Sequence, residues 1–442
     1  MVDSLRFTAE KTLRPCGKGF LASISSFVDP RGRIMGWHDF GYLEGPGWAA
    51  NAVGGAYELH QAAVLLGKEA WRKKALAVLD HVLNHGFIDK KTGFIRPCRI
   101  TPEGLQAMGK PKNEDLFCLN YKKNNDWYCP GSIAKIAFQL LQFADALRGD
   151  KRAARMEEAA YRCALYLRDH VPEVPNGWFP RRVTPRGEIY RKTPEGGNEP
   201  FWQNSADGLF MLQLWAVLQL KGKGDWKKLL RLRTDAFIKA GGIFGSINHD
   251  TYDPHENVAY AVAFRTLRLV SKALEDPSIR AFAYKRCLSG LDKFKMCEDR
   301  NGVATRGLLY MEKTWPTAYL WENAEAALAY FEAASEQPAG SAERRAYELN
   351  GLTILRACAK HHHGPYGFLT EGVDWSNHVG RQHHIGKALY GDIKYTEPFL
   401  NNQHITEPTL FYLEHLARIE KGAGITIRRD CEGNVLLRLA DK

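Results

Sequence analysis

The sequence predicts an all-α protein, an (α/α)6 toroid of six inner and about six outer helices with short β-hairpins between the repeats. Strongly apolar helical runs recur along the chain, and each follows a loop rich in aromatic and hydrogen-bonding side chains. Amphipathic helices alternate with these runs. A helix that is apolar on every face must be buried on every face, and repeated helix pairs bury their apolar surfaces against one another. Six such pairs close most simply into a ring.

The clearest inner helix follows the loop NEPFWQNSAD and begins near Gly208. Asn204, Ser205 and Asp207 supply side-chain oxygens that can cap its first turn. Five further apolar runs follow loops of the same kind. The six predicted inner helices are 49–66, 133–147, 208–220, 258–269, 324–331 and 409–416.

The predicted outer helices have one apolar side and one charged side. Each precedes a short Gly-rich and aromatic segment typical of a hairpin. We expect a short helix at 21–27 to fill the sixth outer place and the tail at about 422–442 to form a β-hairpin. Because no Gly-, Ser- or Pro-rich linker interrupts the chain, we expect residues 1–442 to form one domain. The other outer helices are 69–85, 151–170, 226–240, 277–295 and 342–360.

Composition narrows the class of protein. The 442 residues are 45% hydrophobic and 25% charged, as in soluble globular proteins, and no run reaches the roughly 20 apolar residues of a membrane span. The start, MVDSLRFTAEK, lacks a signal segment, and nine scattered cysteines indicate reduced thiols. We therefore expect a cytoplasmic protein. The basic residues behind the net charge of +11 are spread at helical spacing, which favours solvated helix faces over a nucleic-acid site, and the positive field favours an anionic substrate.

The alternation of inner and outer helices over most of the chain resembles the carbohydrate-active toroids, which include glycoside hydrolases, polysaccharide lyases and sugar epimerases. This resemblance implies a carbohydrate substrate. It carries no family motif, so candidate residues come from the loops that precede the inner helices.

Aromatic side chains in these loops match the C–H faces of sugar rings, and polar side chains match sugar hydroxyls. For each aromatic residue, packing in the core is the competing interpretation. The predicted binding residues are Trp37, His38, Trp127, Trp202, Gln203, Trp315, Trp321, His378, Arg381, His383, Asn402 and His404.

Glycosidic cleavage needs a proton donor and a second carboxyl that acts as base or nucleophile. Asp126 and Asp250 are flanked by Trp127 and His249 and do not look like helix caps, so one of them is the predicted general acid. Asp207 and Glu322 lie where a cap or first-turn acid is also expected. The predicted catalytic residues are Asp126, Asp250, His249, Tyr252 and Glu322.

These residues predict a glycoside hydrolase that acts on short, acidic, uronate-containing oligosaccharides without a cofactor. The histidine-rich segment 361–408 lacks the spacing of a zinc site, so no metal is predicted. Three alternatives stay open: a uronate-specific lyase with a His or Tyr base, a sugar epimerase with two histidines, and a non-catalytic scaffold that binds a glycan or a protein.

Overall fold

A computed structural model describes most of the chain. The described residues are 1–25, 27–28, 34–35, 42–47, 50–245, 247, 253–300, 302–314, 317–362, 368–369, 371–374, 392–393, 398–419, 425–429 and 435–439. Only the backbone is described for 27–28, 34–35, 374, 392–393, 398–403, 416–419, 425–429 and 435–439. Within these residues, no helix is both long enough and apolar enough to cross a membrane.

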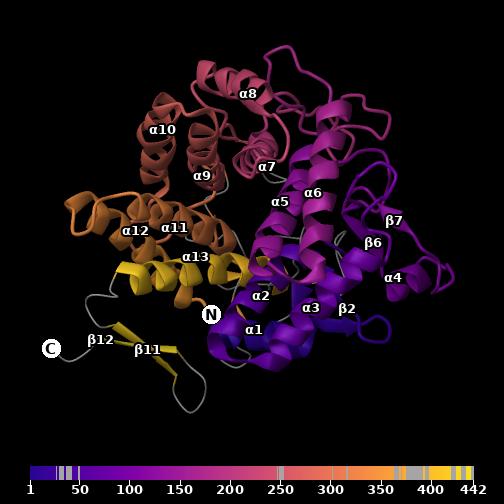
Figure 1. Ribbon diagram of the computed structural model, residues 1–442, viewed down its shortest axis with the longest axis horizontal. Helices are drawn as coiled ribbons and strands as arrows, with labels where there is room; N and C mark the ends of the chain where they lie inside the picture. The colour runs from indigo at the N-terminus through magenta and orange to yellow at the C-terminus, as the bar shows by residue number, and fades with distance from the viewer. Residues whose placement is uncertain are drawn as a thin grey trace.

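Six inner helices form a closed ring, which confirms the predicted toroid. Each inner helix contacts the next one along the chain, and the last, α13, packs against the first, α2. Each of the six predicted apolar runs overlaps one of these helices, and Figure 1 shows the helices arranged around the centre of the molecule. The inner helices are α2 (Ala52–Leu66), α5 (Pro130–Ala146), α7 (Leu209–Leu220), α9 (Asn257–Leu274), α11 (Leu320–Ser335) and α13 (Pro398–Ile419).

The outer helices pack on the outside of this ring, as Figure 1 shows for α8, α10 and α12. Each follows its inner helix in the chain and turns its apolar side inward, because that is the side it can bury. The helix α10 continues into a π-helical turn, Ala283–Cys287, and a 3-10 segment, Leu288–Phe294. The outer helices are α3 (Glu69–Asn84), α6 (Lys151–His170), α8 (Lys227–Lys239), α10 (Pro277–Phe282) and α12 (Ala342–Ala359).

The helix predicted at 21–27 is wrong. Leu21–Ser25 forms strand β2, which pairs antiparallel with β1 (Leu13–Pro15) and with β5 (Leu43–Glu44). Among the described residues, the π-helical turn Thr8–Thr12, which continues α1 (Val2–Phe7), packs against α13 in addition to the inner helices α2 and α11. A short apolar run cannot be assigned to helix or strand from its periodicity alone, and here the pairing partners decided.

Short antiparallel pairings lie between the repeats, as predicted. Single antiparallel bridges join Ile88 to Ile95, Val183 to Ile189, and Lys295 to Leu309 in the connections that follow α3, α6 and the 3-10 segment after α10. The predicted C-terminal hairpin is confirmed by the pairing of β11 with β12. The other strands and the one short helix are β3 (Phe27–Val28), β4 (Ile34–Met35), β6 (Cys98–Ile100), α4 (Pro102–Ala107), β7 (Phe117–Cys118), β8 (Thr317–Tyr319), β9 (Gly372–Asp374), β10 (Asp392–Ile393), β11 (Ile425–Arg429) and β12 (Val435–Leu439).

The inner helices are not apolar throughout. Charged or polar side chains break the apolar surface at Lys135 in α5, Arg265 in α9, Glu325 in α11 and His404 in α13. His404 contacts Lys135 and Glu325, and Arg265 pairs with Glu325, so these side chains meet one another inside the ring. Their contacts define the candidate site.

Candidate active site

The first contacts inside the ring join three inner helices near their N-terminal ends. The Nε2 atom of His404 lies 3.4 Å from Nζ of Lys135 and 3.3 Å from Oε1 of Glu325. His404 and Glu325 are buried, and Lys135 is partly buried. We call Lys135, Arg181, Asp207, Glu325 and His404 the mouth cluster, because they lie at the end of the ring where the inner helices begin.

Glu325 is held in its ionised form. Burial alone would raise the pKa of its carboxyl, but the Arg265 guanidinium and the hydrogen bond to His404 outweigh burial and hold that pKa well below its usual range. The other carboxylate oxygen pairs with Nη1 of Arg265. A carboxylate fixed in this way orients the imidazole of His404.

Lys135 extends from the second turn of α5 toward Glu325. Burial lowers the pKa of its amine, while the carboxylates of Glu325 and Glu407 act in the opposite direction. Its Nζ lies 5.3 Å from the centre of the Phe210 ring, which adds a favourable cation–π contact. The cation therefore lies between a carboxylate and an aromatic face.

Asp207 belongs to the turn that leads into α7 and packs directly on the start of α5. A Cβ on Gly131 would lie 2.0 Å from the carbonyl oxygen of Asp207, so this close approach requires glycine. The Asp207 carboxyl accepts a hydrogen bond from the backbone of Ser132. Burial raises the pKa of Asp207 to about 7, although Arg181 and Lys135 oppose the shift. Near neutral pH this carboxyl can therefore both donate and accept a proton.

A buried ion-pair group supports the Asp207 side of the cluster. Glu199 accepts from Nη1 of Arg181 at 2.9 Å and also pairs with Arg182. The backbone N–H of Arg181 donates to the carbonyl oxygen of Trp202 at 2.9 Å. The guanidinium of Arg191 lies 4.2 Å from the centre of the Trp202 ring. These contacts fix Trp202 beside the mouth cluster.

The structure brings together two of the predicted binding residues. The rings of Trp321 and His404 lie 5.2 Å apart, centre to centre, in an edge-on arrangement. Glu322, in the same turn of α11 as Trp321, is fully buried. Gln203 follows Trp202, and its carbonyl oxygen accepts a hydrogen bond from Asn176 at 3.0 Å.

Two other predicted residues lie apart from these. Trp127 is buried in a small apolar group with Leu43 and Cys98, and the guanidinium of Arg182 lies 5.1 Å from the centre of its ring. Trp127 thus occupies a core position. Asp126 is exposed, and its backbone N–H donates to the side chain of Asn124. The role of Asp126 as general acid stays a prediction. Its carboxyl is exposed, whereas the carboxyl of Asp207 is buried.

The remaining predicted residues lie outside the described part of the chain or lack a described side chain. Only the helical backbone is described for Asn402. The predicted residues outside the described ranges are Trp37, His38, His249, Asp250, Tyr252, Trp315, His378, Arg381 and His383.

The prediction from sequence missed Lys135, Arg181 and Glu325, and it counted Asp207 among the loop carboxyls but, with a helix cap as the competing interpretation, did not choose it as a catalytic residue. A usable signal was present for two of them. Lys135 lies in SIAKIAF and Glu325 in NAEAALA, so each is a charge within a run that is otherwise apolar on every face. Such a charge must face a polar lumen, because its burial without a partner is costly. Among the described residues, no three His, Cys, Asp or Glu side chains converge as metal ligands.

The arrangement provides two carboxyls in opposite ionisation states. Asp207 titrates near neutral pH, whereas Glu325 stays ionised. Environments that separate the pKa values of neighbouring groups are typical of acid–base sites. The ring of Trp321 contacts His404 of the same cluster, and the cations Lys135 and Arg181 lie near these carboxyls.

The sequence matches no known family profile and no curated protein. Solved structures nevertheless share its fold. A sugar epimerase from a ruminal bacterium superposes with a TM-score of 0.62 at 12% identity, over 94% of this chain and 99% of that chain. Cellobiose 2-epimerase from Spirochaeta thermophila gives 0.58 at 14% identity, over 95% and 97%. An unsaturated glucuronyl hydrolase from a Bacillus species gives 0.52 at 13% identity, over 95% and 96%. The chain thus has the toroid fold of these carbohydrate-active enzymes.

Proposed function

We propose that this chain is a carbohydrate-active enzyme, a glycoside hydrolase that cleaves short, acidic, uronate-containing oligosaccharides at the mouth cluster. The observation that carries the proposal is Asp207, a buried carboxyl with a pKa raised to about 7 near Lys135, whose amine also lies near the ionised carboxylate of Glu325. An unsaturated glucuronyl hydrolase is among the proteins of the same fold, which supports an acidic substrate.

In this mechanism Asp207 is the general acid. Its proton passes to the glycosidic oxygen as the bond to the anomeric carbon breaks. Water then adds to that carbon, and the proton that the water releases restores the acid form of Asp207. Glu325, through its contact with His404, keeps the imidazole oriented toward the same space. Lys135 and Arg181 attract the carboxylate of a uronate, and the rings of Trp202 and Trp321 offer faces for the sugar.

The test is turnover of a panel of saturated and unsaturated uronyl oligosaccharides beside neutral ones, measured by release of new reducing ends. We expect hydrolysis of acidic members, with kcat falling as pH rises through about 7, because the donor must be protonated. Asp207→Asn lowers kcat by about 10²–10⁴-fold, the usual contribution of a general acid. Asp126→Asn is the matched control, since Asp126 is exposed. Full activity in Asp207→Asn with loss in Asp126→Asn would assign the acid to Asp126.

Sugar epimerisation is the second candidate, and a specific observation favours it. His404 lies between the partly buried amine of Lys135 and the fixed carboxylate of Glu325, which suits a group that removes a proton from a carbon beside a carbonyl and returns it. The sugar epimerase that superposes at 0.62 agrees with this possibility. In D2O, epimerisation incorporates deuterium at that carbon, whereas hydrolysis does not.

Two further outcomes of the same panel distinguish the remaining alternatives. A lyase gives an absorbance rise from a conjugated uronate product without incorporation of water. A non-catalytic scaffold binds the oligosaccharides and turns none of them over, and Asp207→Asn then leaves binding unchanged. Either result would replace hydrolysis as the function of the mouth cluster.

A further inference from the structure

A cavity occupies the end of the ring lumen opposite the mouth cluster. It has a volume of about 730 Å³, and all six inner helices line it with residues from the middle and C-terminal parts of their lengths. Arg265 separates it from the mouth cluster, since this side chain contacts Glu325 of that cluster and Glu407 at the cavity wall. We call this space the far cavity.

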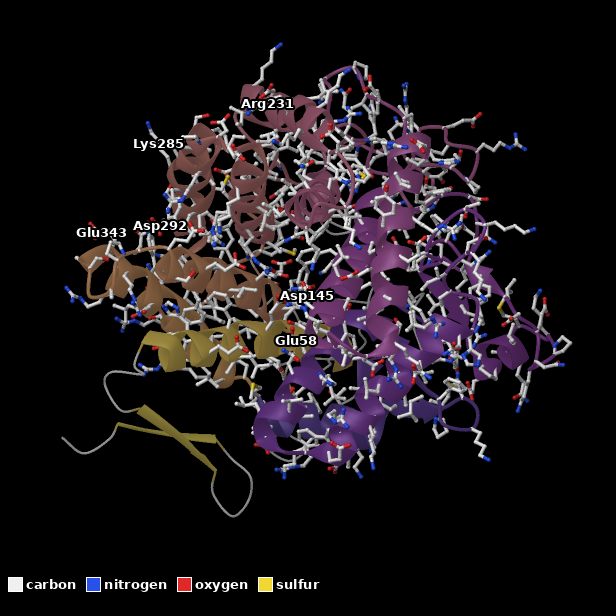
Figure 2. All side chains as sticks on the ribbon, in the orientation of Figure 1. Glu58, Asp145, Arg231, Lys285, Asp292 and Glu343 are labelled. Carbon is white, nitrogen blue, oxygen red and sulfur yellow. The ribbon has the colours of Figure 1, made fainter. Side chains whose placement is uncertain are left out.

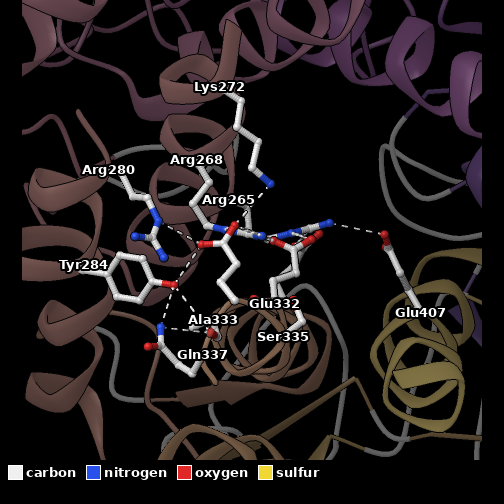
Figure 3. Close-up of polar contacts among 12 residues, drawn as sticks. Arg265, Arg268, Lys272, Arg280, Tyr284, Glu332, Ala333, Ser335, Gln337 and Glu407 are labelled. Atoms are coloured by element: carbon white, nitrogen blue, oxygen red, sulfur yellow. Dashed lines mark hydrogen bonds and ion pairs between the residues drawn. The ribbon is translucent and has the colours of Figure 1, made fainter. Parts of the chain in front are cut away.

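The arginines of the far cavity have no charge left for an anionic ligand. Arg265 pairs with Glu332 at 3.2 Å and with Glu407 at 3.3 Å, in addition to Glu325. Arg268 pairs with Glu332 and, at 2.7 Å, with Glu336 (Figure 3). Each guanidinium is therefore neutralised by at least two carboxylates.

Glu58 is a carboxyl of the far cavity that has no partner among the described residues. This side chain of α2 is only 2% exposed and lines the cavity, and it makes no hydrogen bond or ion pair with any described residue. Burial raises the pKa of Glu58, and the neighbouring Glu407 raises it further. A buried carboxyl without a partner costs free energy, so its presence in a cavity indicates a ligand that compensates it.

The other carboxylates of the far cavity strengthen the negative field around Glu58. Glu414 on α13 is exposed, and Asp145 on α5 is 44% exposed and pairs with Lys221, so the cavity opens to solvent on this side. Figure 2 places Glu58 and Asp145 toward the centre of the ring, whereas Arg231, Lys285 and Glu343 lie at its periphery.

The rest of the wall suits a small organic molecule. Tyr57, Phe138 and Phe411 supply aromatic faces, and Gln142 and Gln213 supply amides that can donate and accept hydrogen bonds. The volume lies within the range of about 300–1,000 Å³ that is common for small-molecule sites. Aromatic faces beside carboxylates attract organic cations.

We propose that the far cavity is a second ligand site, which binds a small primary ammonium compound with Glu58 as its counter-ion. The ammonium group donates hydrogen bonds to Glu58 and lies close to Glu407, while the carbon skeleton packs on the aromatic wall. This site is separate from the mouth cluster and does not depend on the reaction performed there.

Calorimetric titration with 1,4-diaminobutane tests the site, with 1,4-butanediol and succinate as neutral and anionic compounds of matched length. We expect the diamine to bind the wild-type chain and both matched compounds to bind at least about tenfold more weakly. Glu58→Gln lowers diamine affinity at least about tenfold, as expected when one partner of a buried charge pair is removed. Glu343→Gln, at an exposed position on α12, leaves the affinity unchanged.

Failure of the diamine to bind overturns the proposal, and so does equal binding of the diol or of succinate. Unchanged affinity in Glu58→Gln would also overturn it. The comparison of the three compounds uses only the wild-type chain, so the test stands even where the variant does not fold. Glutamine has the shape of a protonated glutamate, so we expect the thermal midpoint of Glu58→Gln to match that of the wild type.

Discussion

Glu336 at the far end of the ring and Asp207 at its mouth have pKa values shifted in opposite directions, although both carboxyls are largely buried. At the far end, burial would raise the pKa of Glu336, but its bonds to Arg268 and the surrounding cations hold it at about 2. At the mouth, Asp207 makes no ion pair with any described residue, and burial raises its pKa to about 7. Burial acts in the same direction at both ends. The number of counter-charges in contact decides which pKa results.

This difference separates structural from functional charge. Arg265 ties α9 to α11 and α13, so its ion pairs help to close the ring. Asp207 and Glu58 form no ion pair of this kind with any described residue. A neutral amide side chain at either position would have a smaller desolvation penalty than an ionised carboxylate. Buried carboxyls that lack ion pairs and line a lumen are therefore the positions where we expect ligands or chemistry.

The largest effect is expected from Arg265→Met at the far end. The substitution leaves Glu325, Glu332 and Glu407 without their shared cation. Removing one partner of a buried ion pair typically costs about 3–5 kcal/mol, so we expect a loss of this size in the free energy of unfolding measured with denaturant. A loss below about 1 kcal/mol would show that these ion pairs do not hold the ring together.

Asp207→Asn is expected to raise the free energy of unfolding, whereas Arg265→Met lowers it. In the wild type, the raised pKa of Asp207 means that its contribution to the free energy of unfolding is present below the pKa of the unfolded chain, about 3.8. This contribution is lost as pH rises through the folded pKa of about 7. Asparagine does not titrate, so the variant becomes more stable than the wild type as pH rises, by on the order of 2–4 kcal/mol above pH 8. Unfolding midpoints at pH 4 and pH 8.5 measure the difference. Equal values for both proteins at both pH values would contradict the assigned pKa.

The smallest effect is expected at the periphery, where Arg231 pairs with Asp276 at 2.7 Å (Figure 2). Both side chains are partly exposed, so water and salt screen their attraction. Arg231→Ala should change the free energy of unfolding by less than about 1 kcal/mol. If Arg231→Ala lowered the free energy of unfolding as much as Arg265→Met does, ion pairs in the lumen would not be more stabilising than ion pairs at the surface.

The site could be predicted only in part. Trp321 and His404 were identified because they lie in aromatic and polar segments around the inner helices, and the structure brings them into contact. Lys135 and Glu325 were overlooked because they interrupt apolar runs that identify buried helices. Trp127 has the same loop context as Trp202, yet it packs in a small apolar group. Loop composition alone does not distinguish a lumen-facing aromatic side chain from a buried one.

The sequence by itself determined the ring, because six apolar runs that alternate with amphipathic helices can be buried only by packing against one another. Only the tertiary structure decided which side chains meet in the lumen. Lys135, Glu325 and His404 come from helices far apart in the chain, and their contact depends on how the ring closes. The raised pKa of Asp207 likewise depends on burial against α5, which no local pattern around residue 207 records.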